Sequence, residues 1–140
     1  MRYVFVDTDV LIDFLIEREP FSTFSAQLFS LAEQKEITIF LTSLSFSNAF
    51  YVLRKFGTRD KLLSKLKEVR LLVKILDVNK KSVDLALASS FTDFEDALQY
   101  YSAIQHGKIS VIITRNIKDY KLSDFPVLTP ESYLKSRVSL

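Results

Sequence analysis

Short apolar runs along the chain alternate with longer stretches in which apolar residues recur every three to four positions. The short runs cover residues 2–6, 37–41, 72–76, 109–113 and 127–128, and each has the length of a β strand. The periodic stretches predict helices over residues 9–17, 22–34, 43–56, 59–69, 80–90, 93–106 and 130–135. Strands that alternate with helices form parallel sheets covered on both faces. We therefore expect an α/β fold, a three-layer α/β/α sandwich around a central, mostly parallel sheet of four to five strands.

Small polar residues and glycines set the expected helix boundaries. The candidate N-cap residues of the first three helices are Asp9, Ser22 or Ser25, and Ser43 or Ser45. The only two glycines, Gly57 and Gly107, stand where the third and sixth predicted helices end. Because no linker, repeat or low-complexity segment interrupts the pattern, residues 1–140 are expected to form a single domain.

Composition narrows the classes of protein that fit. Apolar residues make up 48% of the 140 positions, and the absence of cysteine excludes a disulfide framework or a thiolate metal site. No apolar run approaches the roughly 18 residues that a membrane helix needs. The start at Met1 reaches Asp7 after too few apolar positions for a signal peptide. We expect a cytoplasmic protein without a membrane partner.

Charge is unevenly distributed along the chain. Residues 1–36 hold seven acidic and three basic residues, a net of −4, and residues 84–96 hold four acidic residues and no basic one. Residues 54–74 hold eight basic and two acidic residues, a net of +6. Acidic foci beside a basic stripe are typical of a protein that holds a metal ion and attracts a polyanion. The alternative for the basic stripe alone is a solvated helix face.

Carboxylates and amides cluster where the predicted strands end. Since the carboxyl ends of parallel strands lie at one edge of a sheet, residues far apart in sequence are expected to converge there. These residues are Asp7, Asn48, Asp96, Asn116 and Asp119. Hard oxygen ligands without Cys or His suit Mg²⁺ or Mn²⁺, which can activate water and stabilise phosphoryl transfer. With a single histidine, His106 at a helix end, catalysis by a His–Ser or Cys–His pair is not expected.

Each of these residues also has a simpler explanation. Asp9 and Asp93 fit plain N-caps, and Asp13 fits a solvated helix position. Asn116 and Asp119 fit a loop or a helix start. Asp7 is the hardest to explain in this way, because it directly ends an apolar strand and a buried carboxylate needs a partner.

Three motifs in order resemble the PIN domain family of metal-dependent nucleases, which includes toxins of bacterial toxin–antitoxin pairs. They are VFVDTDVLIDFL, TSLSFSNAFYVLRK, and DFEDALQYYSAIQHGKISVIITRNIKDY followed by FPVLTPESYL. The resemblance covers nearly the whole chain. It implies that Asp7 and Asp96 correspond to two of the four common acidic positions of the family. Asn48 and Asn116 fall at the other two, as is usual in a PIN subgroup with S-x-x-N and T-R-N motifs.

The resemblance implies a Mg²⁺- or Mn²⁺-dependent ribonuclease. The expected catalytic residues are Asp7, Asp96, Asn48, Asn116 and Asp119. The expected metal ligands are Asp7, Asp96, Asp93 and Asp119, with Glu95 restoring some of the charge that the two amides lack. Thr8, Ser43 and Thr114 would hydrogen-bond the carboxylates or the phosphate. The expected RNA-contacting residues are Arg54, Lys55, Arg59 and Arg115.

The implied partners are RNA, a small antitoxin protein if the chain is a toxin, and a second copy in a homodimer. The twelve phenylalanines would supply a dimer interface or the core. Two alternatives stay open at this point. The same fold without turnover would be an RNA-binding or partner-binding module, because amides add no negative charge for a metal. In the second alternative the acidic edge serves only helix caps and salt bridges.

Overall fold

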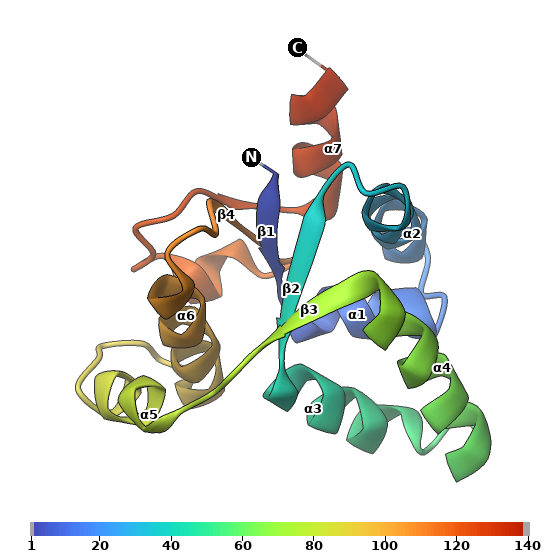
Figure 1. Cartoon of the computed structure of the whole chain (residues 1–140), viewed down its shortest axis with the longest axis horizontal. Helices are drawn as coiled ribbons and strands as arrows, with labels where there is room; N and C mark the ends of the chain where they lie inside the picture. Colours follow the sequence, from blue (N-terminus) through green and yellow to red (C-terminus); the bar gives the residue numbers. More distant parts are fainter. Residues whose placement is uncertain (1, 139–140) are drawn as a thin grey trace.

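A five-stranded parallel sheet forms the centre of the computed structural model, which describes residues 2–138 (Figure 1). The strands are β1 (Tyr3–Val6), β2 (Thr38–Thr42), β3 (Val73–Leu76), β4 (Val111–Ile113) and β5 (Val127–Leu128). Their spatial order is β3-β2-β1-β4-β5, and every neighbouring pair is parallel. The chain thus builds outward from β1 to one edge and then returns to add β4 and β5 on the other side. The predicted mostly parallel sheet is confirmed.

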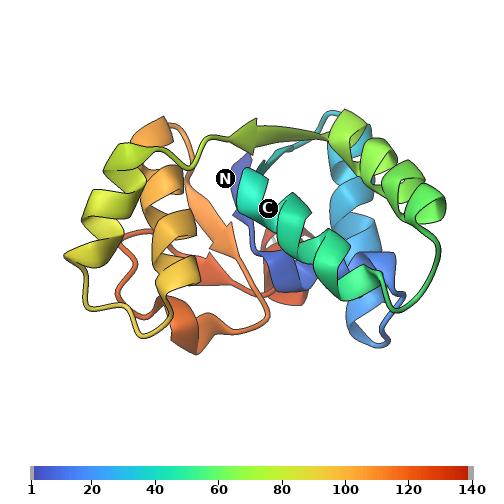
Figure 2. The same ribbon diagram turned by 90° about the horizontal axis from the view of Figure 1, so that it is seen from below.

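Helices cover both faces of the sheet, as Figure 2 shows. One face carries α1 (Thr8–Leu15), α2 (Phe21–Glu33), α3 (Ser43–Leu53), α4 (Arg59–Leu72) and α7 (Pro130–Val138). The other face carries α6 (Phe94–His106) with α5 (Lys80–Leu87) packed beside it, and the short 3₁₀ helix η1 (Ile117–Tyr120). The expected three-layer α/β/α sandwich is therefore confirmed. Among the described residues no helix has the length and apolar character needed to cross a bilayer.

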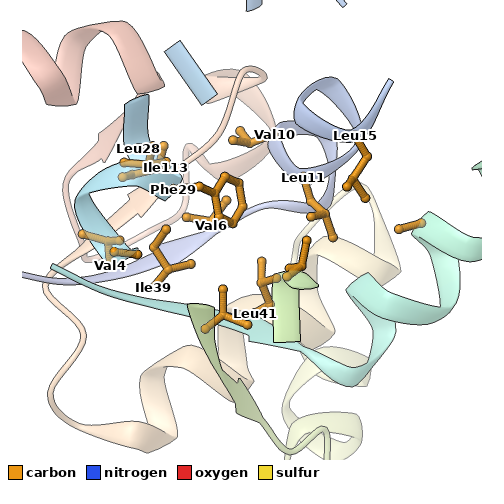
Figure 3. Close-up of a cluster of buried hydrophobic side chains, with 14 of the residues drawn as sticks. Val4, Val6, Val10, Leu11, Leu15, Leu28, Phe29, Ile39, Leu41 and Ile113 are labelled. Carbon is orange, nitrogen blue, oxygen red and sulfur yellow. The ribbon is translucent and has the colours of Figure 1, made fainter. Parts of the chain in front are cut away.

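Alternating side chains of the strands build one core on each face. Val4 and Val6 of β1 point toward α1 and α2, where Leu11, Leu28 and Phe29 meet them (Figure 3). Between them, Phe5 points the other way and packs with Tyr100 of α6. Both faces are apolar because both are covered, which explains the continuous apolar runs in the sequence. Fully burying each such side chain stabilises the fold by about 1.5–3 kcal/mol.

Several predicted helix boundaries are wrong. Asp7, rather than Asp9, caps α1, and Thr42, rather than a serine, caps α3 through a 3.2 Å bond from the Ser45 N–H. Helix α2 begins after Pro20 without a side-chain cap, and the two serines proposed as its caps lie buried inside it. Helix α3 ends at Leu53, so Gly57 does not close it.

The end of α6 agrees with the prediction. Gly107 follows the last helical residue with a φ of +80°, in the left-handed region that glycine adopts without strain. This turn returns the chain from α6 to β4. Because the chain reverses direction here, the first turn of α6 and the carboxyl end of β4 lie at the same edge of the sheet, and both carry acidic motifs.

Candidate active-site cleft

An open cleft of about 370 Å³ lies where β1 and β4 end. Its carboxylates come from β1, α1, the start of α6, and η1: Asp7, Asp9, Asp93, Glu95, Asp96 and Asp119. Asn48, Tyr51 and Val52 of α3 and Asn116 complete much of the wall. No Lys, Arg or His side chain of residues 2–138 lines it. All five residues that the sequence predicted to converge line this cleft: Asp7, Asn48, Asp96, Asn116 and Asp119.

Asp7 lies at the centre of the cleft floor, only 6% exposed. Its backbone N–H continues the β1–β4 ladder to the Ile113 carbonyl at 2.9 Å. The carboxylate accepts a 2.8 Å hydrogen bond from the Thr8 N–H and a 2.8 Å bond from the Thr114 hydroxyl. Position at a strand end and capping of α1 thus fix Asp7, while its two acceptor oxygens remain beside the cleft.

Asp9 gathers the loop after β4. Its Oδ2 accepts hydrogen bonds from the Arg115 N–H at 3.2 Å and from Asn116 Nδ2 at 3.1 Å. Its Oδ1 is buried and has no hydrogen-bond partner among the described residues. A helix cap would not explain these contacts, so the cap interpretation of Asp9 is wrong. The sequence did not indicate this role, because the position of Asp9 shortly after a strand is also typical of a residue that caps a helix.

The first turn of α6 supplies three more carboxylates. Asp93 caps the helix, accepting a 2.9 Å bond from the Asp96 N–H, which confirms its expected capping role. Glu95 accepts a hydrogen bond from the Asn48 side-chain amide of α3. Asp96 accepts a 3.4 Å bond from the Tyr120 hydroxyl, which is buried close to Asp7. The amide of α3 and the phenol of η1 thus hold the acids of α6 against Asp7.

Burial and crowding disfavour negative charge on four of the acids that line the cleft. Burial raises the pKa of Asp7, although its hydrogen bonds from Thr114 and Thr8 oppose the rise. Burial, and then the charge of Asp7, raises the pKa of Asp9 to about 7 and that of Asp96 to about 8. Burial also raises the pKa of Glu95. The common physical cause is burial, to which the charges of neighbouring carboxylates add; for Asp9 the nearby Arg115 guanidinium opposes the rise in pKa.

A divalent cation fits this donor set chemically. The cleft offers oxygen donors of the kind that Mg²⁺ and Mn²⁺ prefer, and Asp9 Oδ1 is a buried oxygen without a partner. In residues 2–138, however, no three acidic or histidine side chains are grouped closely enough to form a ready ligand set. An ion here would therefore take few protein ligands directly and keep several waters, as Mg²⁺ commonly does.

Under the carboxylates lies a buried layer of hydroxyls and one amide. The Thr8 hydroxyl donates to Ser45 Oγ at 3.0 Å, and Ser45 Oγ donates to Gln99 Oε1 at 3.1 Å. Thr42 Oγ1 also donates to Gln99 Oε1, at 3.4 Å. The expected carboxylate contact of Thr114 is present, whereas Ser43 is exposed and does not line the cleft. Ser45 was expected from the sequence only as a candidate helix cap, and nothing in the sequence indicated Gln99.

Asp13 and Arg115 form an ion pair behind the cleft. Asp13 is only 1% exposed, so its expected solvated position is wrong. Arg115 Nε donates to Asp13 Oδ2 at 2.8 Å and its Nη2 donates to Oδ1 at 3.1 Å, while the guanidinium stacks on Phe21. Both residues line a second, separate pocket between α1, α2 and α7. The guanidinium proposed to contact RNA is thus already held by a buried carboxylate.

The other predicted RNA-contacting residues lie after α3 and at the start of α4. Arg54, Lys55 and Arg59 are all exposed. The guanidinium of Arg54 lies 3.9 Å from the ring centre of Tyr51, which is 60% exposed and lines the cleft. Among the basic residues predicted to contact RNA, Arg54 thus lies beside the cleft, against the ring of Tyr51. RNA contact by these residues stays a prediction.

The parallel sheet, its two helical layers and the acidic edge define a PIN-like α/β protein. The model of the PIN domain family matches residues 3–118, and the chain belongs to that family. It is 31% identical over 135 residues to ribonuclease VapC1 of Aquifex aeolicus, covering 93% of this chain and 92% of that protein.

Solved structures share the fold at lower identity. A toxin–antitoxin complex from Klebsiella pneumoniae matches with a TM-score of 0.67 at 18% identity, over 91% of this chain and 97% of that one. Mycobacterium tuberculosis VapC20, a toxin that cleaves the sarcin-ricin loop, matches with a TM-score of 0.60 at 17% identity, over 78% and 86% of the two chains. These likenesses establish the fold.

Proposed function

We propose that this chain is a Mg²⁺- or Mn²⁺-dependent endoribonuclease. The observation that carries the proposal is the cleft, which gathers six carboxylates at the carboxyl edge of the sheet without a basic side chain among the described residues. Such an arrangement is costly unless a cation offsets the mutual repulsion. The relative from Aquifex aeolicus, similar over nearly its whole length, is named a ribonuclease.

Asp7 and Asp96 would hold the ion directly, and Asp93 and Asp119 would hold it through water. When bound, a divalent cation supplies a Lewis acid that makes water a better nucleophile and offsets charge on the phosphate. Thr114 and Thr8 keep the Asp7 carboxylate oriented through their 2.8 Å bonds. Tyr120 keeps Asp96 beside Asp7.

Asn48 and Asn116 orient two further carboxylates rather than supply charge. Asn48 donates to Glu95, and Asn116 donates to Asp9. Each amide therefore lies against an acid, where a carboxylate at the same position would repel it. We add Glu95 and Asp9 to the functional acids on this basis. Six carboxylates remain despite the two amides, which favours an active enzyme over a module without turnover.

RNA would reach the cleft past the exposed Tyr51 and Arg54. The guanidinium of Arg54 would contact a backbone phosphate, and the free face of the Tyr51 ring would stack on a base. Lys55 and Arg59 would extend the positive surface toward α4. Because phosphate contacts release counterions, cleavage is expected to weaken with added salt.

We also propose that a small antitoxin protein is a partner of this chain. The support is the likeness to toxins, including one solved as a toxin–antitoxin complex. Copurification of the chain with the product of a neighbouring small gene would test this. Most of the twelve phenylalanines pack in or against the two cores and so do not supply a dimer interface. A homodimer stays a prediction.

The test is cleavage of a panel of single-stranded and structured RNAs with Mn²⁺ or EDTA. Wild type is compared with Asp96→Asn and with Asp84→Asn, which makes the same change at an exposed residue of α5 outside the cleft. We expect Mn²⁺-dependent cleavage by wild type and Asp84→Asn, and a loss of at least about 100-fold for Asp96→Asn. Folded wild type that binds these RNAs but never cleaves them would favour the binding-module alternative.

A further inference from the structure

Gln99 of α6 lies on the floor of the cleft and is only 1% exposed. Its Oε1 accepts hydrogen bonds from Ser45 Oγ at 3.1 Å and from Thr42 Oγ1 at 3.4 Å. Its Nε2 donates no hydrogen bond to any atom of the residues that the structure describes. Nε2 is not one of the fully buried atoms without a partner, so it opens onto the cleft, where a ligand would complete its hydrogen bonding.

The carboxylates of the cleft favour the orientation in which the Gln99 nitrogen faces them. The Thr8 hydroxyl donates to Ser45 Oγ at 3.0 Å, and Ser45 Oγ donates to Gln99 Oε1 at 3.1 Å, a shorter contact than the 3.4 Å between Ser45 Oγ and Thr42 Oγ1. Reversing the amide would turn its oxygen toward the carboxylates of the cleft, which would add repulsion. The hydroxyl layer therefore presents the two N–H groups of Gln99 to the cleft.

The chemistry of this group selects its ligand. An amide N–H is a hydrogen-bond donor and does not ligate a cation, so a metal ion would not satisfy it. The acceptor that an RNA substrate brings into the cleft is an anionic phosphate oxygen, and bonds from neutral donors to charged acceptors are among the stronger hydrogen bonds. Donors fixed in advance at a developing negative charge also favour the transition state.

We propose that Gln99 donates a hydrogen bond to a non-bridging oxygen of the scissile phosphodiester. This inference rests on the proposed ribonuclease function. Gln99 then places a donor among the carboxylates of the floor, where it would orient the phosphate. Ser45 and Thr42 are positioning residues, because they act by holding the amide.

Two variants remove the N–H groups in different ways. Gln99→Glu keeps an oxygen for the Ser45 and Thr42 hydroxyls, whereas Gln99→Leu removes the whole amide. Gln105→Leu is the matched control, because Gln105 lies on the same helix, outside the cleft, and its amide already donates to Ser82. For each protein we would measure kcat/KM on one single-stranded RNA, the Mn²⁺ affinity by calorimetry, and the melting temperature.

We expect both Gln99 variants to lose about tenfold or more in kcat/KM, which corresponds to about 1.4 kcal/mol. Their Mn²⁺ affinity should not fall, and Gln99→Leu should melt within a few degrees of Gln105→Leu. Full activity of Gln99→Glu would overturn the proposal, since that variant lacks the donor. A fall in Mn²⁺ affinity that matches the loss of cleavage would also overturn it. If wild type itself neither binds nor cleaves RNA, the proposed function fails together with this inference.

Discussion

At the scale of single residues, the site keeps its acids by pairing them with amides. Asn48 and Asn116 occupy positions where the family resemblance implies acids, and each donates its amide to a neighbouring carboxylate, Glu95 or Asp9. The motifs indicated the two amides but not which acids they pair with. The family resemblance points to Asp96 and Asp7, whereas the acids that accept the hydrogen bonds are their sequence neighbours Glu95 and Asp9. The starts of α3 and α6 meet at the carboxyl edge of the sheet, and α1 lies beside the loop after β4, and these two approaches bring each pair together.

The raised pKa values predict that the metal-free protein loses stability as pH rises. The pKa of Asp96 is about 8 in the folded chain, against about 3.9 in an unfolded one. Between these values the unfolded chain has lost a proton that the folded chain still holds, so higher pH favours unfolding. Urea denaturation in EDTA should give a smaller free energy of unfolding at about pH 8 than at about pH 5. Asp96→Asn should flatten this dependence and Asp84→Asn should not; a wild-type stability that rises with pH would contradict the assignment.

The pairing of Asn116 with Asp9 predicts the effect of restoring an acid. Asn116→Asp would replace a 3.1 Å hydrogen bond by repulsion between two carboxylates. In EDTA we expect a loss of about 1 kcal/mol in the free energy of unfolding. Saturating Mn²⁺ should raise the melting temperature of Asn116→Asp more than that of wild type, because the added charge favours the cation. Equal shifts for the two proteins would show that position 116 lies outside the reach of the ion.

At the scale of elements, an ion pair joins α1 to the loop after β4. Asp13 of α1 accepts two hydrogen bonds from Arg115, whose neighbours Thr114 and Asn116 carry contacts of the cleft. Sequence periodicity placed Asp13 on a helix but did not show that its carboxylate is covered. The partner lies about a hundred positions away, and only the β1–β4 pairing brings it near.

Removing Asp13 should be costly, because it leaves the Arg115 guanidinium half-buried without its partner. We expect Asp13→Ala to lower the free energy of unfolding by about 3 kcal/mol, measured by urea denaturation. Arg18→Ala removes the exposed second cation, 3.8 Å from Asp13, and should cost less than about 1 kcal/mol. Similar losses for the two variants would mean that Arg115 does not anchor the loop.

The turn after α6 gives a prediction with an internal control. Gly107 has a φ of +80°, and Gly57 has no such constraint, although a methyl group would meet open space at either position. Gly107→Ala should therefore destabilise the protein by about 1 kcal/mol through backbone strain alone. Gly57→Ala should be neutral or slightly stabilising. Thermal unfolding of the two variants would show whether the left-handed turn is needed; equal melting temperatures would contradict it.

At the scale of the whole molecule, the order of strands decides where the chemistry lies. The sequence predicted the parallel sheet, the number of layers and the convergence of five residues, because apolar runs and strand ends can be located in a single chain. It did not predict that β1 lies between β2 and β4, which is what places Asp7 beside Thr114. Helix caps such as Thr42 were missed because several hydroxyl residues stand side by side there.

The basic stripe is a second property of the whole molecule. Its basic residues lie exposed on the loop before α4, on α4 itself and, for Lys74, on β3, and Arg54 approaches the cleft through Tyr51. Arg54→Ala should weaken RNA binding about equally for different sequences and reduce its dependence on salt, as measured by fluorescence anisotropy across a salt series. Lys81→Ala, at an exposed residue of α5, is the control. An unchanged salt slope for Arg54→Ala would exclude a phosphate contact.

The most direct test of the account is the rate of RNA cleavage as a function of Mn²⁺ concentration, for wild type and Asp96→Asn. If the carboxylates of the cleft hold a catalytic ion, wild type should show a saturable rise that EDTA abolishes. Asp96→Asn should require far more Mn²⁺ or show no cleavage, while remaining folded. Cleavage that is independent of Mn²⁺, or equal in the two proteins, would contradict the assignment of this cleft as the active site.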